Sequence, residues 1–188
     1  MGGHVLRRAA TDHTPRRPVL PGQPISPFSV PIFRSIWLAS MSSNFGGLVQ
    51  AVGASWLMTT LSDSPQEVAL VQASTALPIM FFSLAAGAIA DNLDRRKVML
   101  CAQIYMVVVS LLLAFFAWND WLTPWGLLGF TFAIACGTAL NNPAWQAAVG
   151  DMVPRNALPG AVALNSMGFN MARSVGPAIG GAIVAVAG

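Results

Sequence analysis

Charged residues are scarce in this sequence. They make up 9% of the 188 residues, whereas apolar residues make up 55%. A soluble domain usually carries about 25% charged residues, so a chain of this composition cannot cover a globular surface with them. The scarcity of charge therefore argues against an ordinary soluble domain and indicates a chain that lies in lipid.

Cysteine and histidine are also rare, with two of each in the chain. Cys101 and Cys136 lie in apolar runs without metal-ligand spacing, and both histidines lie near the N-terminus, so we expect no metal site and no cofactor. The apolar stretches also lack a His/Glu metal pair, a Ser/Lys dyad and a Gly-x-Ser-x-Gly elbow. We therefore expect no catalytic residue, and an intramembrane enzyme is not the expected class.

The ten basic residues are segregated along the chain. Five lie within residues 1–34, three form the cluster at 95–97, and only Arg155 and Arg173 lie elsewhere. A nucleic-acid-binding surface would interleave basic residues with aromatic ones, so no nucleic-acid partner is expected. The segregation instead fits basic loops on the cytoplasmic side of a membrane.

Five long apolar stretches follow a tail rich in proline and arginine at residues 1–33. We expect that cytoplasmic tail to be disordered, because it cannot bury a core. A helix needs about 20 residues to cross a bilayer, and each apolar stretch provides that length. The sequence therefore predicts an all-α membrane protein with about five transmembrane helices within residues 34–188. The predicted spans run from about Ile36 to Leu61, Val68 to Ala90, Val98 to Trp118, Leu122 to Val149, and Leu158 to the end.

The loop charges predict the orientation of the chain. With the N-terminus in the cytoplasm, nine of the ten basic residues lie on the inner side. The two outer loops, around Asp63 to Glu67 and around Asp120, then contain no basic residue. Tryptophans flank the second of these loops, as an aromatic belt at the membrane interface would.

Polar residues interrupt several of the predicted spans. Lipid cannot solvate such groups, so they should face the bundle interior or a wet cavity. Hydrogen bonding that merely holds the helices together is the alternative, and Arg173 could also be snorkelling or structurally paired. No acidic residue lies within the five spans, so they contain no visible proton carrier. The candidates for a substrate cavity are Asn44, Gln50, Asn165, Asn170 and Arg173.

The junction of the second and third spans carries a short motif. Gly87 is followed by Asp91 after four residues and by the basic cluster Arg95, Arg96 and Lys97. This pattern resembles the signature loop of the major facilitator superfamily. The glycine would allow close helix packing, and the ions at the membrane boundary would form a latch that breaks and reforms during transport. A plain inside-positive loop is the alternative interpretation.

The fifth span carries a second pattern, Gly176-Pro177-Ala-Ile-Gly180-Gly181. It resembles the Gly-Pro-x-x-Gly-Gly motif in the fifth helix of facilitator antiporters. Pro177 removes one helix hydrogen bond and permits a bend, and Gly176 and Gly180 share one helix face that allows close packing. Helix packing alone is the alternative. Two alanines stand where the family motif has upstream glycines, which weakens the antiporter inference.

Further segments resemble the secretion-effector and enterobactin-exporter-like branch of this superfamily. They include Ser43-Asn44-Phe-Gly46, Pro143-Ala-Trp145-Gln146 and Asp151-Met-Val-Pro154, and the resemblance covers about residues 28–188. It implies a transporter of twelve helices in two six-helix halves that works by alternating access. It also places Asp151 beside Arg95 in the gating loop. The fourth span lacks the arginine that many proton antiporters carry there.

The resemblance implies a bacterial inner-membrane exporter of a siderophore, drug or metabolite, coupled to protons. Its expected partners are the lipid bilayer, the small-molecule substrate, protons and the remaining helices of the transporter. Five spans are an odd count for a fold built of six-helix halves, so we expect an N-terminal fragment that does not transport alone. The alternative function is a membrane scaffold or receptor that uses the facilitator fold without transport.

Overall fold

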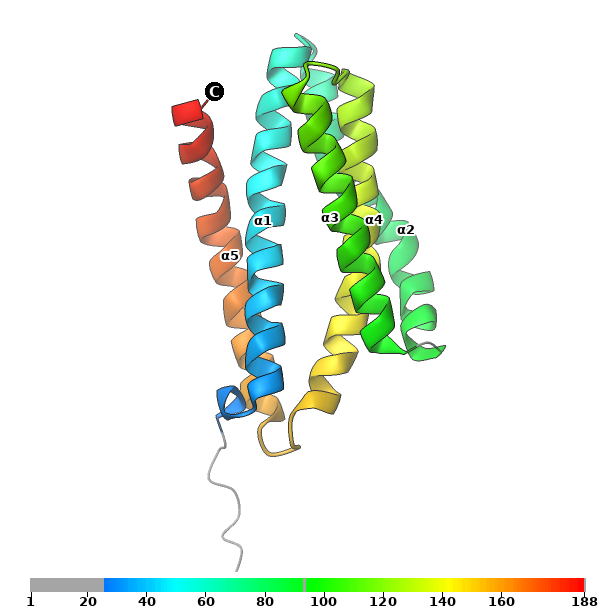
Figure 1. Ribbon diagram of the computed structural model, residues 1–188, viewed down its shortest axis with the longest axis vertical. Helices are drawn as coiled ribbons and strands as arrows, with labels where there is room; N and C mark the ends of the chain where they lie inside the picture. The colour runs from blue at the N-terminus through cyan, green and yellow to red at the C-terminus, as the bar shows by residue number, and fades with distance from the viewer. Residues whose placement is uncertain (1–25, 93, 188) are drawn as a thin grey trace, which may run out of the picture.

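The computed structural model describes residues 26–92 and 94–187, with the backbone alone described for residues 83–92 and 187. Within these residues the structure is entirely helical, as predicted, and successive long helices run in opposite directions (Figure 1). The elements are η1 (Pro27–Ser29), α1 (Pro31–Leu61), α2 (Pro65–Asn92), α3 (Arg95–Trp118), α4 (Pro124–Met152) and α5 (Leu158–Ala187).

The five long helices coincide with the five apolar stretches, but α1 begins earlier than predicted. It starts at Pro31, inside the segment predicted to be a tail, and η1 precedes it. Proline suits the first turn of a helix because its missing N–H needs no partner there. The Phe28 ring packs edge-on against Trp37 with 5.2 Å between ring centroids, which holds the chain against the helix. Residues 1–25 of the predicted tail lie outside the described residues.

Side chains close the ends of the helices at the short connections. The Asp94 carboxylate accepts a hydrogen bond from the Arg96 backbone N–H at 3.0 Å and caps the start of α3. Thr123 caps α4 in the same way by accepting from the Gly126 N–H at 3.1 Å. Between these two helices Asp120 adopts a left-handed conformation with φ of 54°, which lets the chain reverse at once after α3.

The helices form two packing groups (Figure 1). α4 packs mainly against α2 and α3, and α1 packs mainly against α5. Buried apolar side chains gather in two clusters. One includes Phe33, Trp145 and Ala161, near the start of α1 and α5, and the other includes Met58 and Leu127, near the opposite end of α1.

The helices differ in how apolar they are. Among the described residues, α3 and the segment Leu158–Val186 of α5 are long and apolar enough by composition alone to cross a membrane. The other three helices have 31, 28 and 29 residues, which exceeds the length of about 20 that a crossing requires. Each of them contains more serine, threonine, asparagine, glutamine and glycine than α3 does. Such residues are typical of helices whose faces pack against one another in a membrane.

Glycines bring α5 close to α1. A Cβ atom added at Gly176 would lie 2.8 Å from the Leu48 Cβ, and one added at Gly180 would lie 2.9 Å from the Val52 Cβ. Real Cβ contacts are essentially never that short, so both positions require glycine at this separation. Gly181 is different, because an added Cβ there meets nothing within 4 Å. Two glycines of the predicted packing motif therefore lie in the α1–α5 contact, while the third faces away from it.

The α1–α5 contact predicts opposite effects for two adjacent glycines. Replacing Gly180 with Ala should lower the free energy of unfolding by about 1–3 kcal/mol because of overpacking against Val52. Replacing Gly181 with Ala should leave stability unchanged or raise it by up to about 1 kcal/mol, because alanine favours a helix. Thermal unfolding of the purified protein in detergent measures both. Equal effects of the two substitutions would contradict a close contact with α1 at Gly180 that Gly181 does not share.

Candidate functional site

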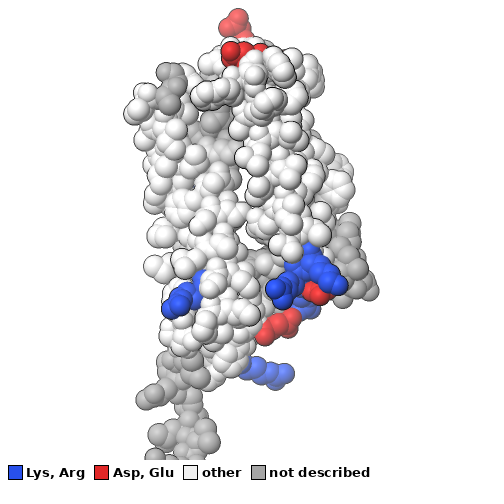
Figure 2. All heavy atoms as spheres, in the orientation of Figure 1, with Lys and Arg blue, Asp and Glu red and all other residues white. Residues whose placement is uncertain are grey.

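The described charged side chains other than Arg173 mark the two ends of the bundle. Arg34, Arg95, Arg96, Lys97 and Arg155 lie at the end where α1, α3 and α5 begin, together with two carboxylates. The other end contains the acidic residues Asp63 and Asp120 in its connections and Glu67 in the first turn of α2. Figure 2 shows a broad band without charged side chains between these two ends. The band is what a bilayer core requires of the surface that it contacts.

The structure brings Arg95 and Asp151 together as an ion pair at the basic end. The Arg95 Nη1 atom donates to Asp151 Oδ2 and also to the Ala147 carbonyl oxygen at 3.3 Å. Arg95 is the first residue of α3 and Asp151 lies in the last turn of α4. Their side chains are 36% and 69% exposed, so water reaches the pair. A cation near the C-terminus of α4 also interacts favourably with the helix dipole.

The structure shows no ion pair for the other predicted members of the gating loop within the described residues. Gly87 and Asp91 belong to α2, in the stretch of residues 83–92 whose side chains lie outside the described residues. Arg96 is exposed, and its backbone N–H contacts Asp94, while its side chain has no partner within the described part of the chain. The gating role of all these residues stays a prediction.

Gln103 forms a polar link that the sequence reasoning did not assign to a site. It accepts from the Ser43 hydroxyl at 3.4 Å, and its Nε2 atom donates to Asn141 Oδ1 at 3.5 Å. The link joins α1, α3 and α4, although both distances are long for hydrogen bonds. The sequence itself marks this position, since Gln103 is the one strongly polar residue in the third predicted span.

On α5 the predicted cavity residues have different surroundings. Asn165 accepts a hydrogen bond from the Trp145 indole Nε1 atom at 2.8 Å, which joins α5 to α4. Asn170 is exposed and donates to the Ser166 carbonyl of its own helix at 2.8 Å. Arg173 is exposed, and its guanidinium lies over the Phe169 ring at 5.7 Å from the centroid.

On α1 both predicted cavity residues are half-buried. The Gln50 Nε2 atom is buried and has no hydrogen-bond partner among the described residues. Gln50 lies seven residues after Ser43 and four before the buried Ala54, so these three share one helix face. Asn44 lies outside that face, toward the contact with α5. The five candidates therefore do not converge on a single site within the described structure, and their role in binding stays a prediction.

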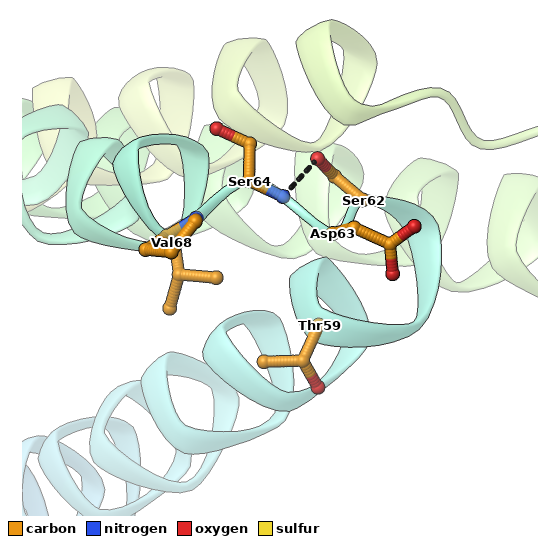
Figure 3. A pocket seen from close by; sticks show the side chains of 6 residues that line it. Thr59, Ser62, Asp63, Ser64 and Val68 are labelled. Carbon is orange, nitrogen blue, oxygen red and sulfur yellow. Dashed lines mark hydrogen bonds between the residues drawn. The ribbon is translucent and has the colours of Figure 1, made fainter.

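Two open hollows occur on the described surface, and none of these five residues lines either. One of about 390 Å³ lies at the turn between α1 and α2. Figure 3 shows its polar rim, where the Ser64 backbone N–H donates to the Ser62 hydroxyl at 3.1 Å. The other, of about 500 Å³, lies between α3 and α4 and is lined by residues that include Lys97, Tyr105 and Leu140.

Comparison with known families decides the classification. Residues 22–188 match the family model described as transmembrane secretion effector, of the major facilitator type. The chain belongs to this family. Membership makes it an integral membrane protein. No solved structure matches the chain.

Several characterised facilitators are similar to this family member. The staphyloferrin A transporter of Staphylococcus aureus is 27% identical over 143 residues, which is 75% of this chain and 36% of that protein. The multidrug efflux pump Tap of Mycobacterium tuberculosis is 28% identical over 159 residues, or 81% and 38%. The macrolide efflux protein A of Streptococcus pyogenes is 23% identical over 154 residues, or 82% and 38%. The matches thus span little more than a third of each relative's length.

The hydrogen bond between Trp145 and Asn165 predicts a structural cost in this facilitator. Trp145 is only 6% exposed, so replacing Asn165 with Leu leaves its indole N–H buried without an acceptor. The expected loss is about 1–2 kcal/mol of unfolding free energy. Adding Trp145→Phe should make the pair of substitutions cost less than the sum of the two single ones, because no orphaned donor remains. Unfolding of all four proteins in mixed micelles measures this cycle, and strictly additive costs would argue against the bond.

Proposed function

We propose that the protein is a secondary active transporter of the bacterial inner membrane that exports a small molecule by alternating access, coupled to the proton gradient. The five helices would form part of its N-terminal half. Support comes from the family match and from relatives named as a staphyloferrin A transporter, a multidrug efflux pump and a macrolide efflux protein. The substrate would then be a siderophore, a drug or a metabolite of similar size.

The observation that carries the proposal is the ion pair between Arg95 and Asp151, at the boundary where alternating access requires a reversible contact. The pair joins the start of α3 to the end of α4 and remains accessible to water. An exposed ion pair contributes only about 0–1 kcal/mol, so it can break and reform during each transport cycle at small cost. Asp91, at the end of α2, would complete the latch with the same arginine.

The distribution of charge supports an orientation with the N-terminus in the cytoplasm. The end where α1 begins contains five described basic side chains, whereas the opposite end contains three acidic residues. Short cytoplasmic loops of bacterial membrane proteins carry the excess of lysine and arginine. Under this orientation the latch lies at the cytoplasmic surface, and the hollow at Asp63 opens outward.

The latch predicts a loss of transport without a comparable loss of stability. Asp151→Asn should reduce efflux strongly in the intact transporter, while unfolding free energy changes by less than about 1 kcal/mol. Arg155→Gln is the control, because that arginine lies at the same end of the bundle, in the connection between α4 and α5, and its side chain has no described partner. Efflux in cells with equal expression measures the effect. Normal efflux in Asp151→Asn and in Asp91→Asn would refute the latch role.

The orientation predicts the location of each loop. Alkaline phosphatase, which is active only outside the cytoplasm, should be active when fused after Asp63 or Asp120. It should be inactive when fused after Arg155, where green fluorescent protein should fluoresce instead. The reverse pattern would show that the N-terminus lies outside.

A further inference from the structure

The register of α5 on α1 sets the depth of Arg173. Gly168 packs against Trp37 and Gly176 packs against Leu48, so the two helices are parallel and Arg173 lies level with the middle of α1. It lies fifteen residues after Leu158 and fourteen before Ala187, at the two ends of α5. At 1.5 Å per residue, these distances are about 22 Å and 21 Å. Arg173 is therefore near the midplane of a bilayer whose hydrocarbon core is about 30 Å thick.

Arg173 lies on a polar face of α5. Ser166, Asn170 and Arg173 follow one another at spacings of four and three residues, which place them on the same side of a helix, and Pro177 and Gly181 continue that side. These five residues are all exposed. They lie beside the glycine face that contacts α1 and away from the exposed methionines Met167 and Met171. Of the two exposed faces, the one around Arg173 is thus the one suited to water or a polar ligand.

Arg173 has no counter-ion within the described structure. The described carboxylates lie at the helix ends, and among the described residues the guanidinium has no ion pair or hydrogen bond beside its interaction with the Phe169 ring. From the midplane an arginine side chain is too short to reach either interface. An ionised group at this depth is expensive unless it faces water or an anion.

The geometry of the side chain favours one kind of ligand. The central carbon of the Arg173 guanidinium lies over the Phe169 ring, 5.7 Å from its centroid. The N–H groups at its edge have no acceptor among the described residues. A guanidinium edge matches a carboxylate, which can accept two parallel hydrogen bonds from it. Phe169 itself offers an apolar surface directly beside that position.

We propose that Arg173 binds the negatively charged group of the substrate, and that the substrate class is a small organic anion with a carboxylate next to an apolar group. This inference rests on the proposed transport function and specifies its ligand. Asn170 and Ser166 extend the polar face along the carboxylate-binding edge. Phe169 contacts the apolar part of the ligand.

Three probes of matched shape test the charge preference. They are 2-naphthoate, 2-naphthamide and 2-naphthylmethylammonium, which are anionic, neutral and cationic. Their binding to the intact protein in lipid nanodiscs can be followed by naphthalene fluorescence. The proteins compared are wild type, Arg173→Gln, Arg173→Lys, and Arg155→Gln as a control that removes one charge from the α4–α5 loop.

The wild type should bind naphthoate more tightly than the other two probes. Arg173→Gln should weaken naphthoate binding about tenfold or more, because it removes a charge-assisted hydrogen bond. Arg173→Lys should be intermediate, since it keeps the charge but loses the planar fork. Arg155→Gln should bind like the wild type. Far-ultraviolet circular dichroism and size-exclusion elution establish that each variant is folded.

Three results would overturn the proposal: no probe binding, equal binding of the three probes by the wild type, or an anion preference that survives in Arg173→Gln. If Arg173→Gln binds the three probes as the wild type does and also melts at a lower temperature, Arg173 contributes to stability and not to probe binding. That result would also overturn the proposal. Transport is measured separately, as gradient-driven naphthoate movement in proteoliposomes. Arg173-dependent binding without such movement would leave the anion site standing and refute transport.

Discussion

The bilayer core offers no water to satisfy polar groups, and the rest of this structure depends on that constraint. Backbone N–H and C=O groups must be paired within each segment, which only helices or closed barrels achieve. The described chain accordingly folds into five long helices with short connections. The same constraint places every described charged side chain except Arg173 near a helix end. Arg173 is informative because it departs from the constraint that the other charges obey.

Lipid also removes the usual driving force for helix packing, since a leucine gains little by leaving acyl chains for another helix. Close backbone approach and interhelical hydrogen bonds must supply the association instead. The contact of α5 with α1 uses the first device, at Gly176 and Gly180. The contact of α4 with α5 uses the second, through Trp145 and Asn165. The ion pair of Arg95 lies outside the apolar core, where water weakens it. The packing contacts thus lie inside the bundle, and the water-accessible ion pair lies at its surface.

Many residues of the candidate site could be predicted from local sequence, but most of their hydrogen-bond partners could not. The pairing of Arg95 with Asp151 followed from a motif and its resemblance to a known family, because both residues lie at helix ends whose positions the apolar stretches indicate. Asn165 could be recognised as a polar residue in a span. Its bond to Trp145 could not be predicted, because it depends on the rotation of α5 relative to α4. Gln103 could likewise be recognised as a polar residue in a span. Its partners on α1 and α4 could not be predicted, because they depend on how the helices are rotated relative to one another.

The sequence by itself determined the all-helical class, the number of long helices and the segregation of charge, because these follow from hydropathy and from the cost of placing charge in lipid. It also indicated the family through short motifs. Only the tertiary structure decided which face of each helix is covered. Gly180 lies against Val52 while Gly181 lies in the open, and Arg173 lies on an exposed polar face beside Phe169. The physical reason is that rotation and register are set by contacts between different helices, such as that of Gly180 with Val52, which no local pattern in the chain contains.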